Sequence, residues 1–542
     1  MSIARSSLVM ASGTVVSRIL GLVRTVLLAY AIGITTFAAD AFGVANQLPN
    51  NVYAIVVGGL LNAVLVPQIV RARVRKDGGQ GYIDGLLTII ILVFAAITVL
   101  ATVLAPVLVR IYTTGWDENT LALATAFAYW CLPQLFFYGL YSILGEVLNA
   151  RSSFGPFMWA PVLNNLVAIA GLIAFIAWFG AGRADSLDWS QPEPIALLAG
   201  TATAGVAAQA LILLFFWKRI GLRFTFNFKW RGLGLRPALK AASWTLAMLV
   251  ITQIGGLVQT NLASSTLAAR NSVGGEGVMV GIASVAVAAT AWLIFMIPHS
   301  IGTVSIATAY FTRMSEHASE RNWAELKKDL NKALRLIILI STFAAIIMAV
   351  LSYPIGRVFA LQYDPAAALG LVLVAMMIGL VPFSINFMLQ RVFYALEDTK
   401  SPFVFTTIQI LVFIVGAYVA AALVPAAALV AAISLVMSFS FTVQAIIAWL
   451  MLRKRIGQLS DGKLFSDSAK IVVASTLSGA AGAAVLWALG GVSESSFAMQ
   501  GVVNALVSSA LVGLAAGITY LAALLALGNE EVRSALTGIR RR

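Results

Sequence analysis

Two arginines lie inside the first strongly apolar stretch of the chain, which runs roughly from Leu8 to Ile34. Arg18 and Arg24 are the charged residues of that stretch. An arginine at the centre of a bilayer costs about 2.5 to 3.5 kcal/mol, so two in one span imply a water-filled cavity or an anionic partner. Six residues correspond to about 9 Å along a helix and about 120° around it. Because guanidinium groups bind phosphate oxygens in pairs, the spacing favours a binding site for a diphosphate.

The alternative interpretation is that one or both arginines extend to the membrane surface or form an internal ion pair. Asp40 begins the next apolar stretch and is expected either to pair with Arg24 or to act in gating. Amide side chains also occur inside apolar stretches, and each either faces a substrate or forms an interhelical hydrogen bond. These candidate cavity residues are Asn46, Gln47, Asn50, Gln253 and Asn261.

The sequence assembles no catalytic or metal-binding constellation. The two histidines, His299 and His317, lie in different regions, and Cys131 lies alone in an apolar stretch, where a small core residue is the simplest interpretation. We therefore expect a protein that is not an enzyme, with no catalytic residues, no metal and no cofactor. Membrane potential or an ion gradient would supply its driving force.

The composition requires an integral membrane protein. Of 542 residues, 60% are hydrophobic and 11% are charged, and apolar stretches of about 20 residues recur along the whole chain, which is typical of membrane-spanning helices. The fold class is therefore an all-α integral membrane protein. About 14 transmembrane helices are predicted, at 8–32, 38–70, 84–109, 121–149, 157–180, 194–217, 239–266, 277–311, 334–352, 366–395, 403–424, 427–452, 468–490 and 500–527.

The net charge of +14 is distributed by loop. Every second loop is basic, as between Arg71 and Lys76 or between Lys218 and Lys240, whereas the alternate loops are acidic or uncharged. Basic loops stay in the cytoplasm, so an even number of spans places both termini there. The charge thus predicts topology and attraction to anionic lipids, and no nucleic-acid partner is expected.

Two similar segments indicate an internal repeat of six spans. Val147–Arg151, followed by Pro156, resembles Phe393–Leu396, followed by Pro402, about 245 residues later. A tandem six-helix unit keeps its orientation, which predicts two six-helix lobes in a parallel pseudo-repeat plus two C-terminal helices. The expected domains are an N-lobe at 1–217, a basic cytoplasmic linker at 218–240, a C-lobe at 241–455, and a C-terminal pair of spans with a short tail at 456–542.

A further segment has helical spacing of apolar residues among charges. Between Ser319 and Arg335, Leu326, Leu330 and Leu334 alternate with acidic and basic side chains. This pattern predicts a helix on the cytoplasmic surface.

The chain resembles the MurJ/MviN family of lipid II flippases, within the superfamily that includes multidrug and polysaccharide exporters (the MOP superfamily). The resemblance spans nearly the whole chain and depends on the order and spacing of short fragments. These are Ser17–Arg24, Ala39–Phe42, Leu48–Asn50, Leu148–Ala150 with Pro156 and Pro161, Gln253–Ile254, Asn261–Ser264, and Phe393–Leu396 with Asp398–Pro402.

The resemblance implies a flippase that moves the undecaprenyl-pyrophosphate-linked peptidoglycan precursor from the inner to the outer leaflet of the bacterial plasma membrane by alternating access. Arg18 and Arg24 would face the diphosphate head group, with Asp40 as a cavity charge, and spans 13 and 14 would form a groove for the lipid tail. Expected partners are lipid II, a polyprenyl diphosphate-linked glycopeptide, together with anionic membrane lipids and other cell-wall synthesis proteins.

The chain departs from the family pattern in two places. An arginine that family members often carry after the Leu-Pro-Asn of span 2 is replaced here by Asn51, Val52 and Tyr53, and another is missing before Pro298. Head-group binding is therefore expected to rely on Arg18 and Arg24, supplemented by Asn50 and Tyr53.

Three alternatives stay open at this point. A flippase for another polyprenyl-linked glycan would have nearly the same chemistry. A cation-coupled drug exporter of the same superfamily would need a carboxylate at its binding centre, for which Asp40 is the candidate. A membrane glycosyltransferase would need acidic residues at the membrane face, such as Asp117 and Glu118.

Overall fold

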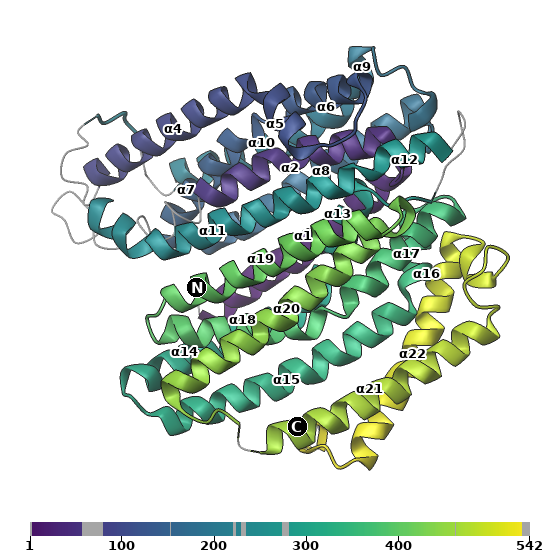
Figure 1. Cartoon of the computed structure of the whole chain (residues 1–542). Helices are drawn as coiled ribbons and strands as arrows, with labels where there is room; N and C mark the ends of the chain where they lie inside the picture. The colour runs from purple at the N-terminus through teal and green to yellow at the C-terminus, as the bar shows by residue number, and fades with distance from the viewer. Residues whose placement is uncertain are drawn as a thin grey trace. The chain divides into compact units, whose positions relative to one another are not determined.

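The computed structural model describes residues 3–56, 80–151, 153–219, 224–228, 235–273, 281–460 and 462–533. These residues form helices joined by short connections, and the described part of the chain contains no strand (Figure 1). Twelve of the helical segments are long and apolar enough to cross a membrane, or up to 13 if a bent pair counts as one span. The expected span at 38–70 is described only as far as Val56. The prediction of an all-helical, multi-pass membrane protein is confirmed.

The chain divides into two compact units, Met1–Leu267 and Ala268–Arg542. The long helices of the first unit are α1 (Ile3–Ile32), α2 (Phe37–Val56), α4 (Gln80–Val103), α5 (Ala105–Tyr112), α6 (Glu118–Cys131), α7 (Gln134–Ala150), α8 (Phe154–Phe179), α10 (Thr201–Arg219) and α11 (Leu235–Ser264). Short elements between α8 and α10 are η2 (Ala184–Ser186), α9 (Pro192–Ile195) and the π-helical turn η3 (Ala196–Gly200). Helix α12 (Thr266–Val273) contains the boundary between the units.

The second unit contains α13 (Val285–Pro298), the π-helical turn η4 (His299–Thr303), α14 (Val304–Ser319), α15 (Trp323–Val350), α16 (Ser352–Phe359), α17 (Tyr363–Met377), α18 (Leu380–Ala395), α19 (Lys400–Leu423) and α20 (Ala426–Ile456). The last two spans are α21 (Lys463–Ala488) and α22 (Val502–Ala526), preceded by the short helix η5 (Phe497–Met499).

Capping residues mark where several helices begin and end. Asp117 and Asn322 accept hydrogen bonds from backbone N–H groups in the first turns of α6 and α15, as N-terminal capping residues do. Asp398 accepts from the N–H groups of Lys400 and Ser401 at the start of α19. Gly180 and Gly457 follow α8 and α20 with φ of 87° and 81°, a region that a side chain disfavours.

The internal repeat extends to individual backbone hydrogen bonds. The N–H of Ser153 donates to the Leu148 carbonyl at 2.9 Å, and 245 residues later the N–H of Asp398 donates to the Phe393 carbonyl at the same distance. Helix breaks recur as well, because α4 and α5 separate at Leu104 and α15 and α16 separate at Leu351. The fourth span of each repeat is also interrupted, between α6 and α7 and, with a bend of 46°, between α17 and α18.

The boundary between the units differs from the expected domain division. The seventh span, expected to open the C-lobe, is α11 and belongs to the first unit. Its C-terminal end is fastened to the connection between α5 and α6, where Ser264 accepts from the Thr114 N–H at 2.8 Å and, through its carbonyl, from the Trp116 indole at 3.0 Å. These hydrogen bonds give α11 partners in the first unit.

The expected surface helix between Ser319 and Arg335 is corrected by the structure. Its second part is the beginning of α15, which continues to Val350. The apolar residues Leu326, Leu330 and Leu334 are at most 1% exposed, because this stripe packs into the core of the second unit.

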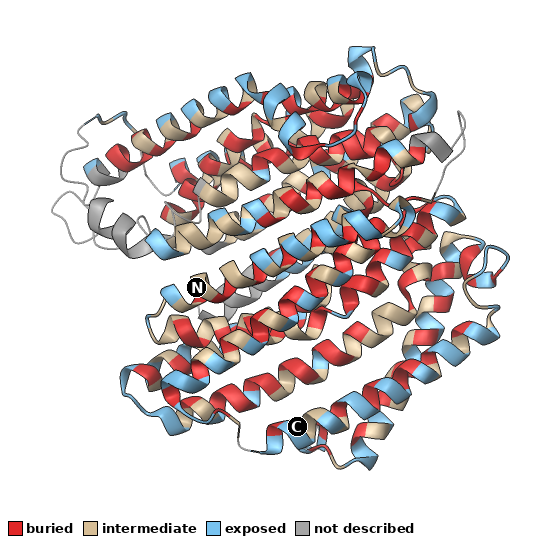
Figure 2. Cartoon of the chain, in the orientation of Figure 1, coloured by how far each residue is buried: buried red, intermediate tan, exposed pale blue. Residues whose placement is uncertain are grey.

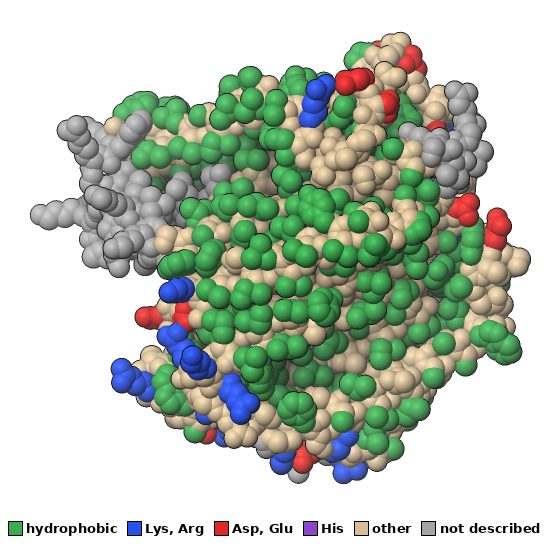
Figure 3. Space-filling model, viewed as in Figure 1, with side chains coloured by type: hydrophobic (Ala, Val, Ile, Leu, Met, Phe, Trp, Pro, Cys, Tyr) green, Lys and Arg blue, Asp and Glu red, His purple; other side chains and the backbone are tan. Residues whose placement is uncertain are grey.

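Exposed side chains are suited to a lipid environment. Buried residues follow one side of most helices while intermediate and exposed ones follow the other (Figure 2). In the space-filling view, hydrophobic side chains cover the flanks of the helices and charged side chains gather near helix ends (Figure 3). An apolar exterior with charged ends is the arrangement that a bilayer requires.

Candidate functional site

Helix α1 is placed by close packing against α8. Asn165 of α8 donates from its amide nitrogen to the Ser17 carbonyl at 2.8 Å and to the Ser17 hydroxyl at 3.3 Å. One turn away on either side, Gly13 lies against Trp159 and Gly21 against Asn165. Small residues at positions 13, 17 and 21 share one face of a helix, and such residues let membrane helices approach closely. The packing therefore fixes the rotation of the helix that carries Arg18 and Arg24.

The two arginines differ in their surroundings. Arg18 is exposed, whereas Arg24 is half-buried and interacts electrostatically with Tyr138 of α7. Among the described residues, no carboxylate forms an ion pair with Arg24. The convergence of both side chains on one diphosphate stays a prediction.

Tyr138 belongs to a group of uncharged polar side chains inside the first unit. It comes from three helices and is called the polar cluster below. Its members are Asn46, Asn50 and Tyr53 of α2, Gln134, Tyr138 and Ser142 of α7, and Thr203 of α10.

Gln134 is the centre of the polar cluster and is 1% exposed. Its amide nitrogen donates to the Asn46 side chain at 3.3 Å and to the Thr203 hydroxyl at 3.0 Å, while its amide oxygen accepts from the Tyr138 hydroxyl at 3.2 Å. Thr203 in turn donates to the Trp130 carbonyl at 2.6 Å, at the end of α6. These bonds satisfy a fully buried amide and orient the Tyr138 hydroxyl.

Asn50 and Tyr53 complete the cluster on α2. Tyr53 shares a short hydrogen bond with the Ser142 hydroxyl, and its ring lies 5.3 Å from that of Tyr138 between centroids. Asn50 lies next to Tyr138 and is exposed. Both residues predicted to supplement the arginines thus lie beside Tyr138, which is an electrostatic neighbour of Arg24.

The structure places the remaining candidates outside the polar cluster. Asp40 is fully buried in the first turn of α2. In the described part of the chain it forms no ion pair with Arg24, and its role in gating stays a prediction. Gln47 accepts from the Thr260 hydroxyl at 3.3 Å. Asn261 accepts from the Thr114 hydroxyl at 2.9 Å and donates to the Ile111 carbonyl, so it fastens α11 to the end of α5. Gln253 is half-buried.

Sequence reasoning missed Tyr138, Ser142 and Thr203 as site residues. A signal was present, because Gln134, Tyr138 and Ser142 follow one another at intervals of four and Asn46, Asn50 and Tyr53 at four and three. Both spacings place polar groups along one face of a helix. Two such faces in neighbouring spans predict a polar contact between them.

The two histidines lie in the second unit and in separate settings. The His299 ring is 2% exposed, beside the Ser384 hydroxyl at 3.1 Å and the Phe383 ring. His317 lies 3.4 Å from a carboxylate oxygen of Asp329, which also pairs with Arg313. Within the described ranges, no group of three or more His, Cys, Asp or Glu side chains is placed to hold a metal ion.

Known proteins resemble this chain over most of its length. The model of the family described as lipid II flippase MurJ matches residues 28–508. A probable lipid II flippase MurJ of Haemophilus influenzae is 26% identical over 430 residues, which cover 72% of this chain and 75% of that protein. A probable lipid II flippase MurJ of a Synechocystis species is 25% identical over 499 residues, which cover 90% and 88%.

Solved structures share the fold. A lipid II flippase MurJ in an inward closed conformation superimposes with a TM-score of 0.69 at 18% identity, covering 93% of this chain and 98% of that one. A MATE protein in the straight conformation gives a TM-score of 0.55 at 17% identity, covering 86% and 96%. The fold expected from the sequence is therefore found among solved membrane proteins.

Proposed function

Because the chain belongs to the family of lipid II flippases called MurJ, we propose that it moves lipid II from the inner to the outer leaflet of the bacterial plasma membrane by alternating access. The activity of the family, flipping of lipid II, identifies the cargo. The observation in this chain that supports the proposal is a half-buried arginine, Arg24, held in the membrane interior beside uncharged polar groups.

The chemistry of this position suits an anion. In place of a carboxylate, Arg24 has the Tyr138 hydroxyl as its neighbour, so the guanidinium keeps its charge-assisted hydrogen bonds for a ligand. Tyr138, Asn50 and Tyr53 add hydroxyl and amide groups that bind sugar and phosphate oxygens. We propose that the diphosphate binds at Arg24 and that the exposed Arg18 attracts it into the cavity.

A polar head group must avoid bare hydrocarbon throughout its passage, because unsatisfied polar groups there cost several kcal/mol each. Asn50, Tyr53 and Tyr138 of the polar cluster are exposed or half-buried and offer such a lining. Gln134 is buried and orients the Tyr138 hydroxyl. Spans α21 and α22 expose Leu477, Val503 and Leu514 among other apolar side chains, which suits the proposed groove for the lipid tail.

The basic loops determine the proposed topology, and the charge of the head group determines the proposed driving force. We propose that both termini are cytoplasmic, because the basic loops lie on that side. An anionic head group that moves outward gains about 2.3 kcal/mol per charge for each 100 mV of inside-negative potential. Membrane potential or an ion gradient then drives transport, and no catalytic step is needed.

The proposal is tested by following two carrier lipids in cells in which the protein can be depleted. Depletion should reduce lipid II at the outer surface, while a polyprenyl-linked precursor of a surface polysaccharide continues to appear there. Unchanged outer lipid II together with loss of the other lipid would assign the protein to a different polyprenyl-linked glycan.

A further inference from the structure

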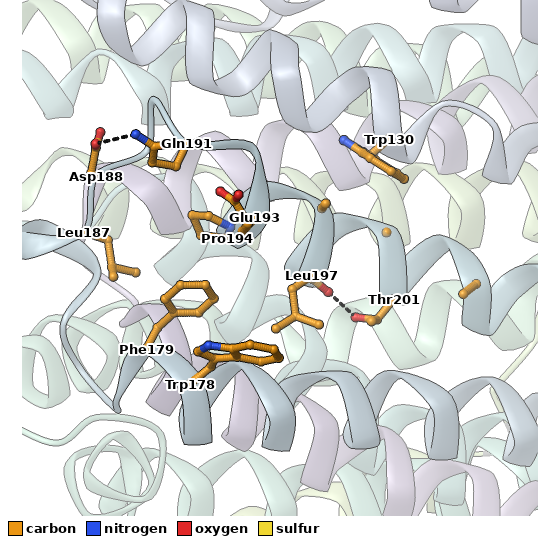
Figure 4. A pocket seen from close by; sticks show the side chains of 13 residues that line it. Trp130, Trp178, Phe179, Leu187, Asp188, Gln191, Glu193, Pro194, Leu197 and Thr201 are labelled. Atoms are coloured by element: carbon orange, nitrogen blue, oxygen red, sulfur yellow. Dashed lines mark hydrogen bonds between the residues drawn. The ribbon is translucent and has the colours of Figure 1, made fainter.

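An open cavity of about 760 Å³ lies at one end of the first unit, outside the polar cluster (Figure 4). Trp130 of α6, Trp178 and Phe179 of α8, and Leu197 of η3 line it. Figure 4 shows the aromatic side chains of α8 facing the turns that lead into α10. The cavity is called the aromatic groove below.

The aromatic groove extends from the loop before α9 along the side of α10. Glu193 and Ala204 both line it, and the eleven steps along the chain from one to the other correspond to about 16 Å of helix rise. Half of the hydrocarbon core of a bilayer is about 15 Å thick. The groove therefore has the length of one leaflet.

Small residues on one side of η3 and α10 create the space. Ala196, Gly200 and Ala204 line the groove at intervals of four, and a Cβ at Gly200 would lie 3.3 Å from the Trp130 ring. Ala196 and Gly200 belong to the π-helical turn η3. Such turns are rare and frequently occur at functional sites.

The rim of the groove is acidic. Glu193 is exposed and has no hydrogen bond or ion pair with the residues that the structure describes. Asp188 accepts from the hydroxyl and the N–H of Ser190 and from Gln191, and these hydrogen bonds hold the pKa of Asp188 below its ordinary value. No Lys or Arg is among the residues that line the groove. The rim thus presents negative charge above an apolar channel.

We propose that the aromatic groove binds one phospholipid of the extracytoplasmic leaflet whose head group carries a primary ammonium. One acyl chain lies along Ala196, Gly200 and Ala204, and the ammonium group lies at Glu193. The length of the groove fits a single leaflet, and its acidic rim favours a cationic amine over an anionic head group. Trp178, in the last turn of α8, suits the interfacial depth. The inference requires the proposed topology but not the identity of the transported lipid.

The deep end of the groove adjoins the polar cluster. The carbonyl of Trp130 accepts from Thr203, whose hydroxyl also accepts from Gln134. A lipid chain against the Trp130 ring therefore packs on the break between α6 and α7 that these bonds hold. Bound lipid should raise the thermal midpoint of the protein, because a ligand stabilises the state that binds it.

The test uses the full chain reconstituted in bilayers that contain phosphatidylethanolamine or phosphatidylglycerol with brominated acyl chains, which quench nearby tryptophans. Trp178→Phe identifies the part of the quenching that comes from the groove. We expect that part to show about threefold tighter binding of phosphatidylethanolamine than of phosphatidylglycerol. This ratio corresponds to the contribution of one exposed ion pair to binding. Glu193→Gln should abolish this preference. Ala204→Phe should lower the Trp178-dependent quenching to the same level for both lipids, since Trp178 is 80% exposed and still meets bulk lipid.

Two matched variants serve as controls. Glu494→Gln removes an exposed acid of the second unit, and Ala96→Phe adds a ring to an exposed face of α4; both should retain the preference. Equal quenching by the two lipids in the unchanged protein, or a preference that survives Glu193→Gln, would overturn the proposal. No Trp178-dependent quenching by either lipid would also overturn it, since the occupant would then be something other than a phospholipid. Outer-surface lipid II, measured separately, reports on the flippase function.

Discussion

Arg24 of α1 and Tyr138 of α7 interact inside the membrane-spanning part of the first unit, although 114 positions separate them in the chain. The Tyr138 hydroxyl donates to Gln134, which is buried and bonded to two further helices. Arg24 thus has an uncharged, hydrogen-bonded tyrosine as its electrostatic neighbour. Because this neighbour carries no negative charge, the charge of the guanidinium stays available for an anion.

Replacing Arg24 by lysine should reduce transport at least about tenfold, because a lysine cannot form the paired hydrogen bonds that a guanidinium forms with phosphate. The measurement is the rate at which lipid II becomes accessible at the outer surface, normalised to the amount of protein in the membrane. Arg110→Lys provides the control, since Arg110 is exposed and pairs with Glu118 at 3.3 Å. Wild-type transport by Arg24→Lys would show that charge alone suffices.

Replacing Arg18 by alanine should also abolish transport, with the protein still inserted. Arg18 is exposed on α1, so its effect should depend on ionic strength more strongly than that of Arg24, as exposed charges are screened by salt. Binding of a soluble diphosphate to purified protein, measured at low and high salt, checks this expectation. An equal salt dependence in the Arg18→Ala and Arg24→Ala variants would contradict it.

Asn165→Leu should weaken transport by changing the position of α1. It removes the bonds to the Ser17 carbonyl and hydroxyl, worth about 1 kcal/mol for a typical hydrogen bond, and places a larger apolar group near Gly21. Ser17→Ala, which keeps the carbonyl acceptor, should have the smaller effect. Thermal unfolding and transport are compared for both variants, and a larger loss in Ser17→Ala would contradict this role for Asn165.

Asp398 should make stability depend on pH at the start of α19. Burial raises its pKa, but hydrogen bonds from Ser401 and Lys400 and the Arg455 guanidinium outweigh burial and hold the pKa below its ordinary value. A lowered pKa stabilises the fold above about pH 4, and the contribution is lost as the pH falls through the pKa of the folded state. Asp398→Asn should therefore lower the free energy of unfolding at pH 7 by about 1 kcal/mol, and the thermal midpoint with it.

The difference in thermal midpoint between the wild type and Asp398→Asn should become smaller as the pH approaches 3. Glu397→Gln is the neighbouring control, since Glu397 is exposed and should show no such dependence. A difference that stays constant with pH would mean that Asp398 acts through packing alone.

Most of the fold is predictable from the sequence because a bilayer imposes strict requirements. Apolar stretches long enough to span it were identifiable, and each of the fourteen expected spans corresponds to a described helix or pair of helices, although those at 38–70 and 277–311 are described only in part. The repeat was visible in Leu148 and Phe393, whose carbonyls accept equivalent hydrogen bonds. Helix breaks at Leu104 and Leu351 were not predicted, since hydropathy does not report where a helix bends.

The candidate site was predictable in part. Arg24 can be identified as a site residue from the sequence, because a charge in an apolar span requires a partner. That Tyr138 is its electrostatic neighbour depends on how the helices pack. Asn261 gives a second example. The sequence around an amide is the same whether the amide faces a cavity or, as observed, joins α11 to the end of α5 by hydrogen bonds. Tertiary packing decides between these roles, and the residue spacing within one helix gives no information about that packing.

The central claim is that Arg24 binds the diphosphate of lipid II during its passage across the membrane. The most direct measurement is lipid II accessible at the outer surface of cells that are depleted of the native protein and express Arg24→Ala at wild-type membrane levels. We predict that outer lipid II falls to the level of depleted cells, whereas Arg110→Ala restores it. Full restoration by Arg24→Ala would contradict the assignment of this arginine to the transport site.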